Sequence, residues 1–320
     1  MIEIREAQVK KEGSPKEGLS LLSCDEQVFV GKPAICRKYV EKEKKDEPLL
    51  ELTWLMNEAV YYSIAKSAGL RMPEARILVV PEDGLFFGSE YLSSAKPMQD
   101  QGTLKEVVSV NLDQLTRALV LDLLLFNSDR TIGRQGDILC DDGKLFFIDH
   151  GHSLWGDGRC FGDLHRIEHE CYSPEIVRGY VKDFLRCKEA NALVWKEDNW
   201  SLAQKLFRET REKTKNEFRS ACDSLKGLQR DEGVTAWRGS TKMLFQPRLV
   251  SCMAEALGKW AEELHRGYFQ DGDGWNKIAD LSVRSRSPRS VAGNLESRFP
   301  DSWLRAGTPC RGGDGSNPDP

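Results

Sequence analysis

A predicted β-hairpin between two acidic motifs is the feature that most constrains how this chain folds. The apolar runs 138–140 and 145–148 have the length of strands, and the Asp-Gly dipeptide at 142–143 favours a tight primed turn. The hairpin returns the chain to its starting point, so we expect Asp129 and Asp149, which flank it, to lie close together. This layout is typical of phosphoryl-transfer sites, where one acid activates the acceptor and the other holds Mg²⁺ on the phosphates of ATP.

The composition is that of a globular protein and argues against several other classes. The chain has 320 residues, a hydrophobic fraction of 40% and a formal net charge of -4, which argues against general nucleic-acid binding by charge. Its nine cysteines include no CxxC pair and no apolar leader follows Met1, so we expect a reducing, cytoplasmic location. The apolar stretch 119–126 is shorter than the roughly 20 residues of a membrane span and predicts a buried helix instead.

The N-terminal region predicts two strands joined by a glycine-containing loop. Strands are expected at 2–9 and 19–23, with Gly13 and Ser14 in the loop between them. In kinase-like folds a loop of this kind covers the phosphates of the nucleotide. An ordinary hairpin connection is the alternative.

Lys38 and Glu58 form a candidate ion pair. Lys38 lies in a predicted strand over 28–40, and Glu58 lies in a helix expected to run from about residue 49 to Gly69. A lysine on a strand and a glutamate on the next helix can aim the ammonium group at the α- and β-phosphates. Taken singly, each residue could be a solvated surface charge.

Two further strands, at 76–80 and 85–89, are expected to complete a small antiparallel sheet. Glu90 and Tyr91 follow directly, where the backbone of a kinase-like hinge would bond to adenine. A simple strand end is the alternative, because side-chain identity does not decide a backbone contact.

The helical pattern that begins at residue 112 is apolar on most faces and contains Asp122. A buried carboxyl group needs hydrogen-bond partners, such as backbone N–H groups of the following loop or Arg130. We therefore expect Asp122 to brace that loop.

Together these motifs resemble the HipA-like kinases, particularly their minimal subfamily with a shortened kinase fold. The matching elements stand in the family's order over roughly the first half of the chain: Gly13-Ser14-Pro15, Lys38, Asn57-Glu58, 87–92, 127–131 and 148–151. The resemblance implies an atypical Ser/Thr-kinase-like fold that uses ATP and Mg²⁺. It also implies that Asp129 is the catalytic base, with Asn127 in the same motif, and that Asp149 is the principal metal ligand.

The predicted fold class is therefore α+β with two lobes. The first lobe, over 1–92, is a small antiparallel sheet with one helix and binds the nucleotide. The second, over 93–270, is mostly helical and contains the catalytic hairpin, with helices expected at 174–185, 200–221 and 249–268. Residues 271–320 are rich in Gly, Pro, Ser and Arg and predict a disordered tail.

One position departs from the kinase pattern. Arg134 stands about five residues beyond Asp129, where kinase-like enzymes place a metal-binding Asn, and an arginine cannot coordinate a cation. Asp137, directly before the first hairpin strand, could replace that Asn as the second Mg²⁺ ligand. Without such a replacement the chain would bind nucleotide weakly or be a pseudokinase.

Four residues allow a separate zinc site, although their spacing matches no standard ligand pattern: Cys160, His165, His169 and Cys171.

Three functions remain open. The favoured one is an ATP-dependent kinase acting on the hydroxyl group of an unknown protein or small molecule, with an antitoxin-like or regulatory protein as a further partner. The second is a lipid kinase related to the phosphoinositide 4-kinases, but the chain lacks a palmitoylation patch and a basic amphipathic face. The third is a nucleotide-binding regulator or pseudokinase.

Overall fold

A computed structural model describes most of the first half of the chain and two later segments. The described residues are 2–10, 19–33, 48–81, 84–98, 104–125, 127, 137–151, 153–154, 199–225 and 247–270. All of them lie in one compact unit, Met1–Ser282. The helix expected at 174–185, the four candidate zinc ligands and the tail lie outside the described residues, and the boundaries at residues 92 and 270 stay predictions.

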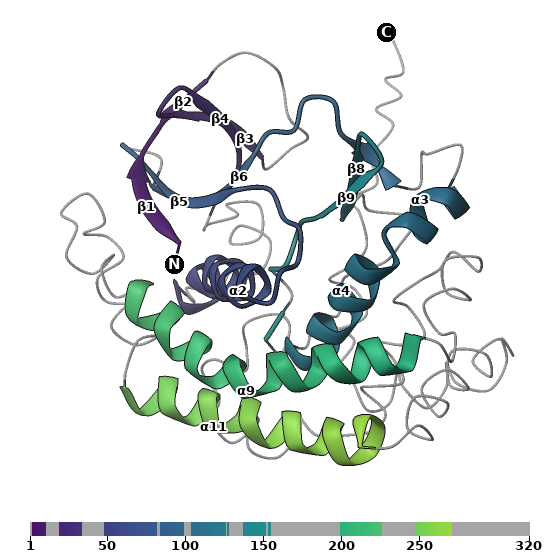
Figure 1. Cartoon of the computed structure of the whole chain (residues 1–320). Coiled ribbons are helices and arrows are strands. Elements are labelled where there is room, and N and C mark those ends of the chain that lie inside the picture. The colour runs from purple at the N-terminus through teal and green to yellow at the C-terminus, as the bar shows by residue number, and fades with distance from the viewer. Residues whose placement is uncertain are drawn as a thin grey trace, which may run out of the picture. The chain divides into compact units, whose positions relative to one another are not determined.

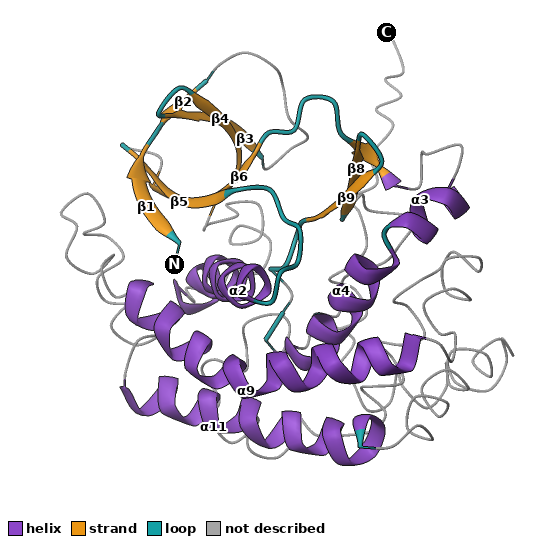
Figure 2. Ribbon diagram, in the orientation of Figure 1, coloured by secondary structure: helices purple, strands orange, loops and turns teal. Residues whose placement is uncertain are grey.

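Six strands form one curled sheet (Figures 1 and 2), in the order β1-β5-β6-β4-β3-β2. Their bounds are β1 (Glu3–Glu6), β2 (Gln8–Val9), β3 (Ser20–Cys24), β4 (Gln27–Pro33), β5 (Ala75–Val80) and β6 (Gly84–Glu90). The strands expected near β3, β5 and β6 are confirmed. The strand expected at 2–9 is divided into β1 and β2, and the described part of the strand expected at 28–40 belongs to β4. The prediction of a purely antiparallel sheet is wrong at one edge, because β1 pairs with β5 in parallel. The connection between them is long enough to allow this pairing, since it includes three strands and a helix.

Apolar side chains lie on both faces of the sheet, as the twofold alternation of strands requires. One face packs a small cluster of Ala7, Leu22, Cys24, Phe29, Leu78, Val80 and Phe86. Gly31 and Gly88 face each other across β4 and β6, and a Cβ atom on either would lie 2.4 Å from a leucine of that cluster. The tight curl therefore depends on glycine at both positions. The other face joins the main core, where β6 packs against a helix, α2.

The helices are α2 (Pro48–Ser67), α3 (Leu104–Val110), α4 (Leu112–Leu125), α9 (Trp200–Leu225) and α11 (Pro247–Leu264), the last continuing into a π-helical turn, η5 (His265–Phe269). Helix α9 packs against α2, α4 and α11. The predicted helices at 200–221 and 249–268 are confirmed, and so is the burial of 119–125 in α4. Within the described ranges no helix is both long enough and apolar enough to cross a membrane.

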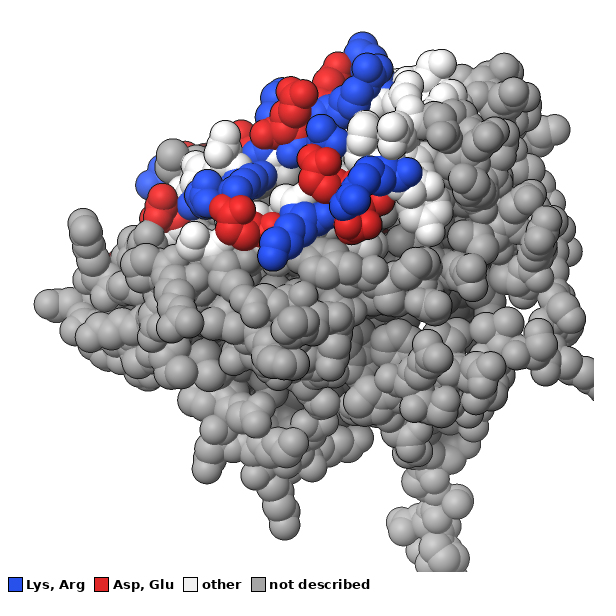
Figure 3. Space-filling model, turned by 90° about the horizontal axis from the view of Figure 1, so that it is seen from below, with Lys and Arg blue, Asp and Glu red and all other residues white. Residues whose placement is uncertain are grey.

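Charges of both signs alternate over one face of the described residues (Figure 3). Several pair between α9 and α11, including Lys215 with Glu255 at 2.5 Å and Arg211 with Glu262 at 3.6 Å. On the described part of this face, positive and negative side chains therefore pair with one another.

The predicted hairpin is confirmed as β8 (Ile138–Asp141) and β9 (Lys144–Phe147). Asp142 and Gly143 have φ values of 47° and 71°, the left-handed conformation that a type I′ turn requires at both positions. Strand β7 (Lys96–Pro97) adds to the free edge of β8. The segment that leaves β6 thus connects the curled sheet to the hairpin.

Candidate functional site

Three segments that are far apart in the sequence meet at one cluster of charged side chains. The ammonium nitrogen of Lys32, on β4, lies 3.1 Å from Oε1 of Glu58, on α2. The same nitrogen lies 2.7 Å from Oδ1 of Asp149, which comes soon after β9. The cluster therefore fastens the sheet, the helix and the hairpin to one another.

The alternation of β4 aims Lys32 at this cluster. Phe29 and Gly31 face the small core, so Lys32 projects from the opposite face together with Val28 and Val30. The strand ends at the next residue, Pro33, which has no N–H to donate to a neighbouring strand.

Glu58 is the most deeply buried charge of the cluster, with 2% of its surface exposed. Its second carboxyl oxygen accepts the backbone N–H of His150 at 2.9 Å. Burial raises the pKa of the Glu58 carboxyl above its ordinary value, while Lys32 opposes the rise and Asp149 adds to it. Burial by itself lowers the pKa of Lys32, but the carboxylates of Asp149 and Glu58 outweigh it and hold that pKa above its ordinary value. The two carboxyl groups therefore favour the charged form of Lys32.

Asp149 has a strained backbone and an accessible side chain. Its φ is 58°, in the left-handed region that residues other than glycine seldom adopt. Such strain costs roughly 1–3 kcal/mol and gathers at functional sites. The side chain of Asp149 is 40% exposed, unlike that of Glu58. The carboxyl group of Asp149 is thus the more accessible of the two in the cluster.

Gly151 allows the cluster to close. A Cβ atom at this position would lie 3.0 Å from Nζ of Lys32 and 3.5 Å from Oε1 of Glu58. The φ of Gly151 is not in the left-handed region, so close approach is the reason that glycine is needed here.

Helix α2 holds the loop after the hairpin, which we call the post-hairpin loop (residues 149–151 and 153–154). The side-chain amide of Asn57 donates to the carbonyl of Gly151 at 2.8 Å, and the hydroxyl of Ser153 donates to the carbonyl of Asn57 at 3.3 Å. The ring of Tyr61 stacks on that of His150, with centroids 4.0 Å apart and planes at 8°. Together with Glu58, these contacts fix the loop to one face of the helix.

Asp122 is buried at the end of α4, with 1% of its surface exposed. Its Oδ1 accepts the hydroxyl of Tyr61 at 2.6 Å and the side-chain amide of Asn127 at 3.0 Å. The expectation that Asp122 is a buried brace for the following loop is confirmed. Asn127 is itself 2% exposed and donates to Asp122, which favours a positioning role for Asn127 over contact with a substrate.

The hairpin brings Asp137 to the same end as Asp149. Asp137 directly precedes β8, and its carbonyl accepts the N–H of Ile148, the residue before Asp149, at 3.0 Å. Within the described part of the chain no group of three or more His, Cys, Asp or Glu side chains could hold a metal. Mg²⁺ in nucleotide sites is usually held by one or two carboxylates, with phosphates and waters as its other ligands. The side chain of Asp149 is accessible to such an ion, whereas Asp137 is 3% exposed, so a metal-binding role for Asp137 stays a prediction.

Other predicted site residues lie outside the described residues: Gly13, Ser14, Lys38, Asp129, Arg130 and Arg134. The lysine that contacts Glu58 and Asp149 is Lys32, an earlier residue of the strand predicted over 28–40. Sequence reasoning missed Lys32, although its alternation with Val28 and Val30 on one face of β4 was a usable signal.

The backbone N–H groups of the predicted hinge are engaged within the sheet. Glu90 donates to the carbonyl of Glu74 at 2.8 Å, and Tyr91 donates to the carbonyl of Val28 at 2.9 Å. Adenine contact with this segment would therefore use carbonyl oxygens or residues beyond Tyr91.

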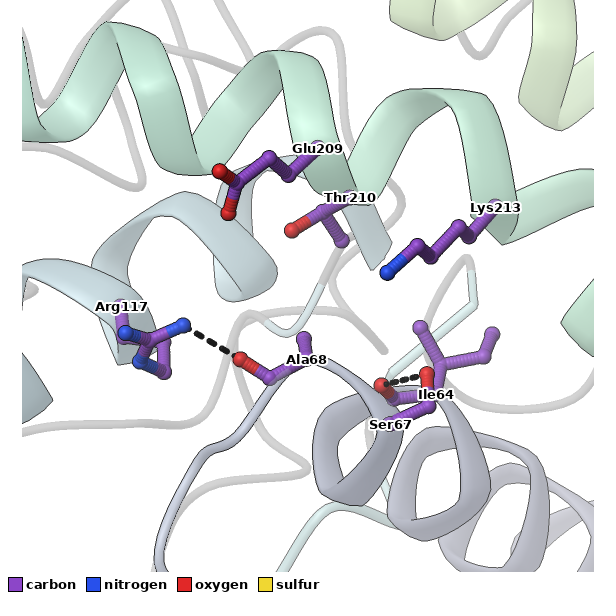
Figure 4. A pocket seen from close by; sticks show the side chains of 7 residues that line it. All are labelled: Ile64, Ser67, Ala68, Arg117, Glu209, Thr210 and Lys213. Carbon is purple, nitrogen blue, oxygen red and sulfur yellow. Dashed lines mark hydrogen bonds between the residues drawn. The ribbon is translucent and has the colours of Figure 1, made fainter.

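A separate pocket lies among the end of α2, α4 and α9 (Figure 4). It is lined by Ile64, Ser67, Ala68, Arg117, Glu209, Thr210 and Lys213. Arg117 donates to the carbonyl of Ala68, which satisfies a backbone acceptor at the C-terminal end of α2. The pocket shares no residue with the Lys32 cluster, and we assign it to helix packing.

Neither known family models nor curated proteins match the chain. Among solved structures the chain is similar to the Helicobacter pylori proinflammatory kinase CtkA, with a TM-score of 0.43 and 12% identity. That similarity covers 82% of this chain and 99% of CtkA. A likeness this distant decides neither fold nor activity, so the chemistry has to be argued from the site itself.

Proposed function

We propose that this protein is an ATP- and Mg²⁺-dependent phosphotransferase of kinase-like fold, which transfers the γ-phosphate to a hydroxyl acceptor. The observation that carries the proposal is the contact of Lys32 with both Glu58 and Asp149. A strand lysine paired with a helix glutamate, beside an aspartate that follows a hairpin, is the arrangement that positions ATP and its metal in protein kinases.

Each residue of the cluster has a distinct role in this proposal. Lys32 binds oxygens of the α- and β-phosphates, and Glu58 keeps its ammonium group in place. Asp149 and Asp137 would hold Mg²⁺, which neutralises charge on the β- and γ-phosphates. Asp129 accepts the proton of the acceptor hydroxyl. The acceptor oxygen then forms a bond to the γ-phosphorus as the bond to the bridging oxygen breaks and ADP leaves.

The accessibility of Asp149 supports a ligand-binding role over a purely structural one. An ion pair that served stability alone would need neither the left-handed backbone of Asp149 nor a glycine at 151 to bring the groups together. Binding of nucleotide and metal would replace the contact of Lys32 with Asp149 while leaving the buried contact with Glu58 intact.

The test is thermal stabilisation by ATP with and without Mg²⁺, together with transfer of labelled γ-phosphate, in Lys32→Met and Asp149→Asn. Lys66→Met is the matched control, because Lys66 is also a lysine paired with a carboxylate, Glu74, but at an exposed site. We expect Mg²⁺-dependent stabilisation and transfer in the wild type and the control, and loss of both in the two site variants. Equal stabilisation in all four proteins would refute the proposed site.

The same assay separates the other functions. Stabilisation by Mg²⁺–ATP without transfer to any acceptor would indicate a nucleotide-binding regulator. Label in the chain itself or in an added protein would indicate a protein kinase, and label in phosphoinositide vesicles a lipid kinase.

A further inference from the structure

The side chain of Tyr61 contacts two segments of the site, helix α4 and the post-hairpin loop. Its hydroxyl donates to Asp122, and its ring stacks on His150. His150 directly follows Asp149, and its N–H donates to Glu58. Tyr61 is 0% exposed, so both contacts are closed to water.

Asp122 in turn binds Asn127, which lies in the segment that leads to Asp129. Its backbone carbonyl accepts the N–H of Asn127 at 3.0 Å, and its side chain accepts the amide of the same residue at 3.0 Å. Asn127 is thereby fixed at two points. Asp129 is two residues further on, a span of at most about 7 Å in an extended chain.

A second link runs in parallel with the first. The N–H of Leu154, in the post-hairpin loop, donates to the carbonyl of Leu125 at the end of α4 at 2.6 Å. The end of α4 and the post-hairpin loop are thus joined both directly and through Tyr61.

We propose that Tyr61 and Asp122 are positioning residues. They fix the position of Asn127, and so of the segment that leads to Asp129, relative to the post-hairpin loop that begins at Asp149. This inference rests on the proposed phosphotransferase function. Misplacing a reacting group by about 1 Å can lower a rate about 100-fold, so the position of Asp129 relative to Asp149 matters for transfer. Among the described residues, Lys32 donates to Glu58 and Asp149 and not to Tyr61 or Asp122, so nucleotide affinity should not depend directly on the last two.

The test compares Tyr61→Phe and Asp122→Asn with Thr116→Val. Thr116 is also fully buried on α4 and donates to the carbonyl of Leu112, but it makes no contact with either loop in the described structure. In Tyr61→Phe and Asp122→Asn we expect kcat to fall at least about tenfold while KM for ATP stays within about threefold of wild type. Thr116→Val keeps its kcat, whatever stability it loses. The double variant Tyr61→Phe/Asp122→Asn is no slower than the slower single variant, because the two residues act as a unit.

Amide hydrogen exchange provides a readout that does not require transfer. In Asp122→Asn we expect the amides of His150, Ser153 and Leu154 to exchange at least about tenfold faster than in wild type. These three amides are hydrogen-bonded, and Thr116→Val leaves their exchange unchanged.

The outcomes separate the positioning role from the proposed function. Unchanged kcat in a folded Tyr61→Phe protein, or equal loss of kcat in Thr116→Val, would overturn the positioning role while leaving phosphotransfer intact. If the wild type binds Mg²⁺–ATP without transfer, phosphotransfer fails, and hydrogen exchange alone decides whether the two segments are coupled. A wild type that binds no nucleotide overturns both.

Discussion

The substitution Lys32→Met removes the cation that, among the described residues, pairs with the buried carboxyl group of Glu58. Glu58 then keeps the backbone N–H of His150 but loses its charged partner. Asp149 loses the same partner, although its exposed side chain can turn to water. The destabilisation should therefore come mainly from Glu58.

The size of the effect follows from burial. Breaking a buried ion pair by removing one partner typically costs about 3–5 kcal/mol. Because the side chain of Lys32 is 29% exposed, we place the loss near the lower end, at about 3 kcal/mol at neutral pH. In Lys66→Met, the exposed matched control, the loss should stay below about 1 kcal/mol.

The stability lost in Lys32→Met should depend on pH, and the pKa of Glu58 determines in which direction. Burial already raises the pKa of Glu58 in the folded protein, and removing Lys32 raises this pKa further because the opposing charge is gone. A carboxyl group whose pKa is higher in the folded state favours folding at low pH and disfavours it as pH rises. The penalty of Lys32→Met should accordingly be smaller at mildly acidic pH than at neutral pH, because Glu58 takes up a proton more readily in the variant.

Urea unfolding of wild type, Lys32→Met and Lys32→Met/Glu58→Gln at both pH values measures this. The neutral amide of Gln needs no counter-ion, so the double variant should recover about half of the lost stability at the higher pH. The reasoning is refuted if the double variant is no more stable than Lys32→Met, or if the penalty is the same at both pH values.

Three other substitutions test single features of the site and the hairpin. Gly151→Ala should reduce the affinity for Mg²⁺–ATP about tenfold in a binding titration, because the added Cβ displaces the movable end of Lys32. The accompanying loss of stability should be only about 1 kcal/mol. Unchanged affinity would contradict the need for close approach at Gly151. Gly143→Ala should destabilise the protein by roughly 1–2 kcal/mol in urea unfolding through its left-handed φ alone, without changing nucleotide affinity, since no atom lies within 4 Å of the added Cβ. The variant Lys38→Met should still be stabilised by Mg²⁺–ATP in a thermal-shift assay. If this stabilisation were lost, Lys38 rather than Lys32 would be the phosphate-binding lysine.

The sequence predicted the features that depend on neighbouring residues. The hairpin follows from two short apolar runs and an Asp-Gly turn, and the observed φ values of Asp142 and Gly143 match that local signal. Local composition likewise predicts that α2 ends near Gly69, that α4 is buried and that Asp122 needs hydrogen-bond partners.

Features that depend on packing between distant segments could not be predicted. Strand β1 pairs with β5, from which it is separated in the chain by three strands and a helix, and no local pattern specifies a parallel partner at that distance. Lys32 and Lys38 both fit a strand over 28–40, and the contact of Lys32 with Glu58 depends on how α2 packs on the sheet, which no local pattern specifies. The stacking of Tyr61 on His150 has no sequence signature at all, because it depends on where the hairpin returns the chain.

Helix α2 connects the described segments of the site. Asn57, Glu58 and Tyr61 stand at positions i, i+1 and i+4, and each contacts the post-hairpin loop. The same helix packs on β6, α4 and α9, so the core fixes its position from several directions. Moving α2 away from the hairpin would break the Lys32–Glu58 pair, the hold on the loop and the Tyr61–Asp122 bond together. Nucleotide binding and the alignment of the two acids are therefore two consequences of one packing arrangement, although the substitutions described above address them separately.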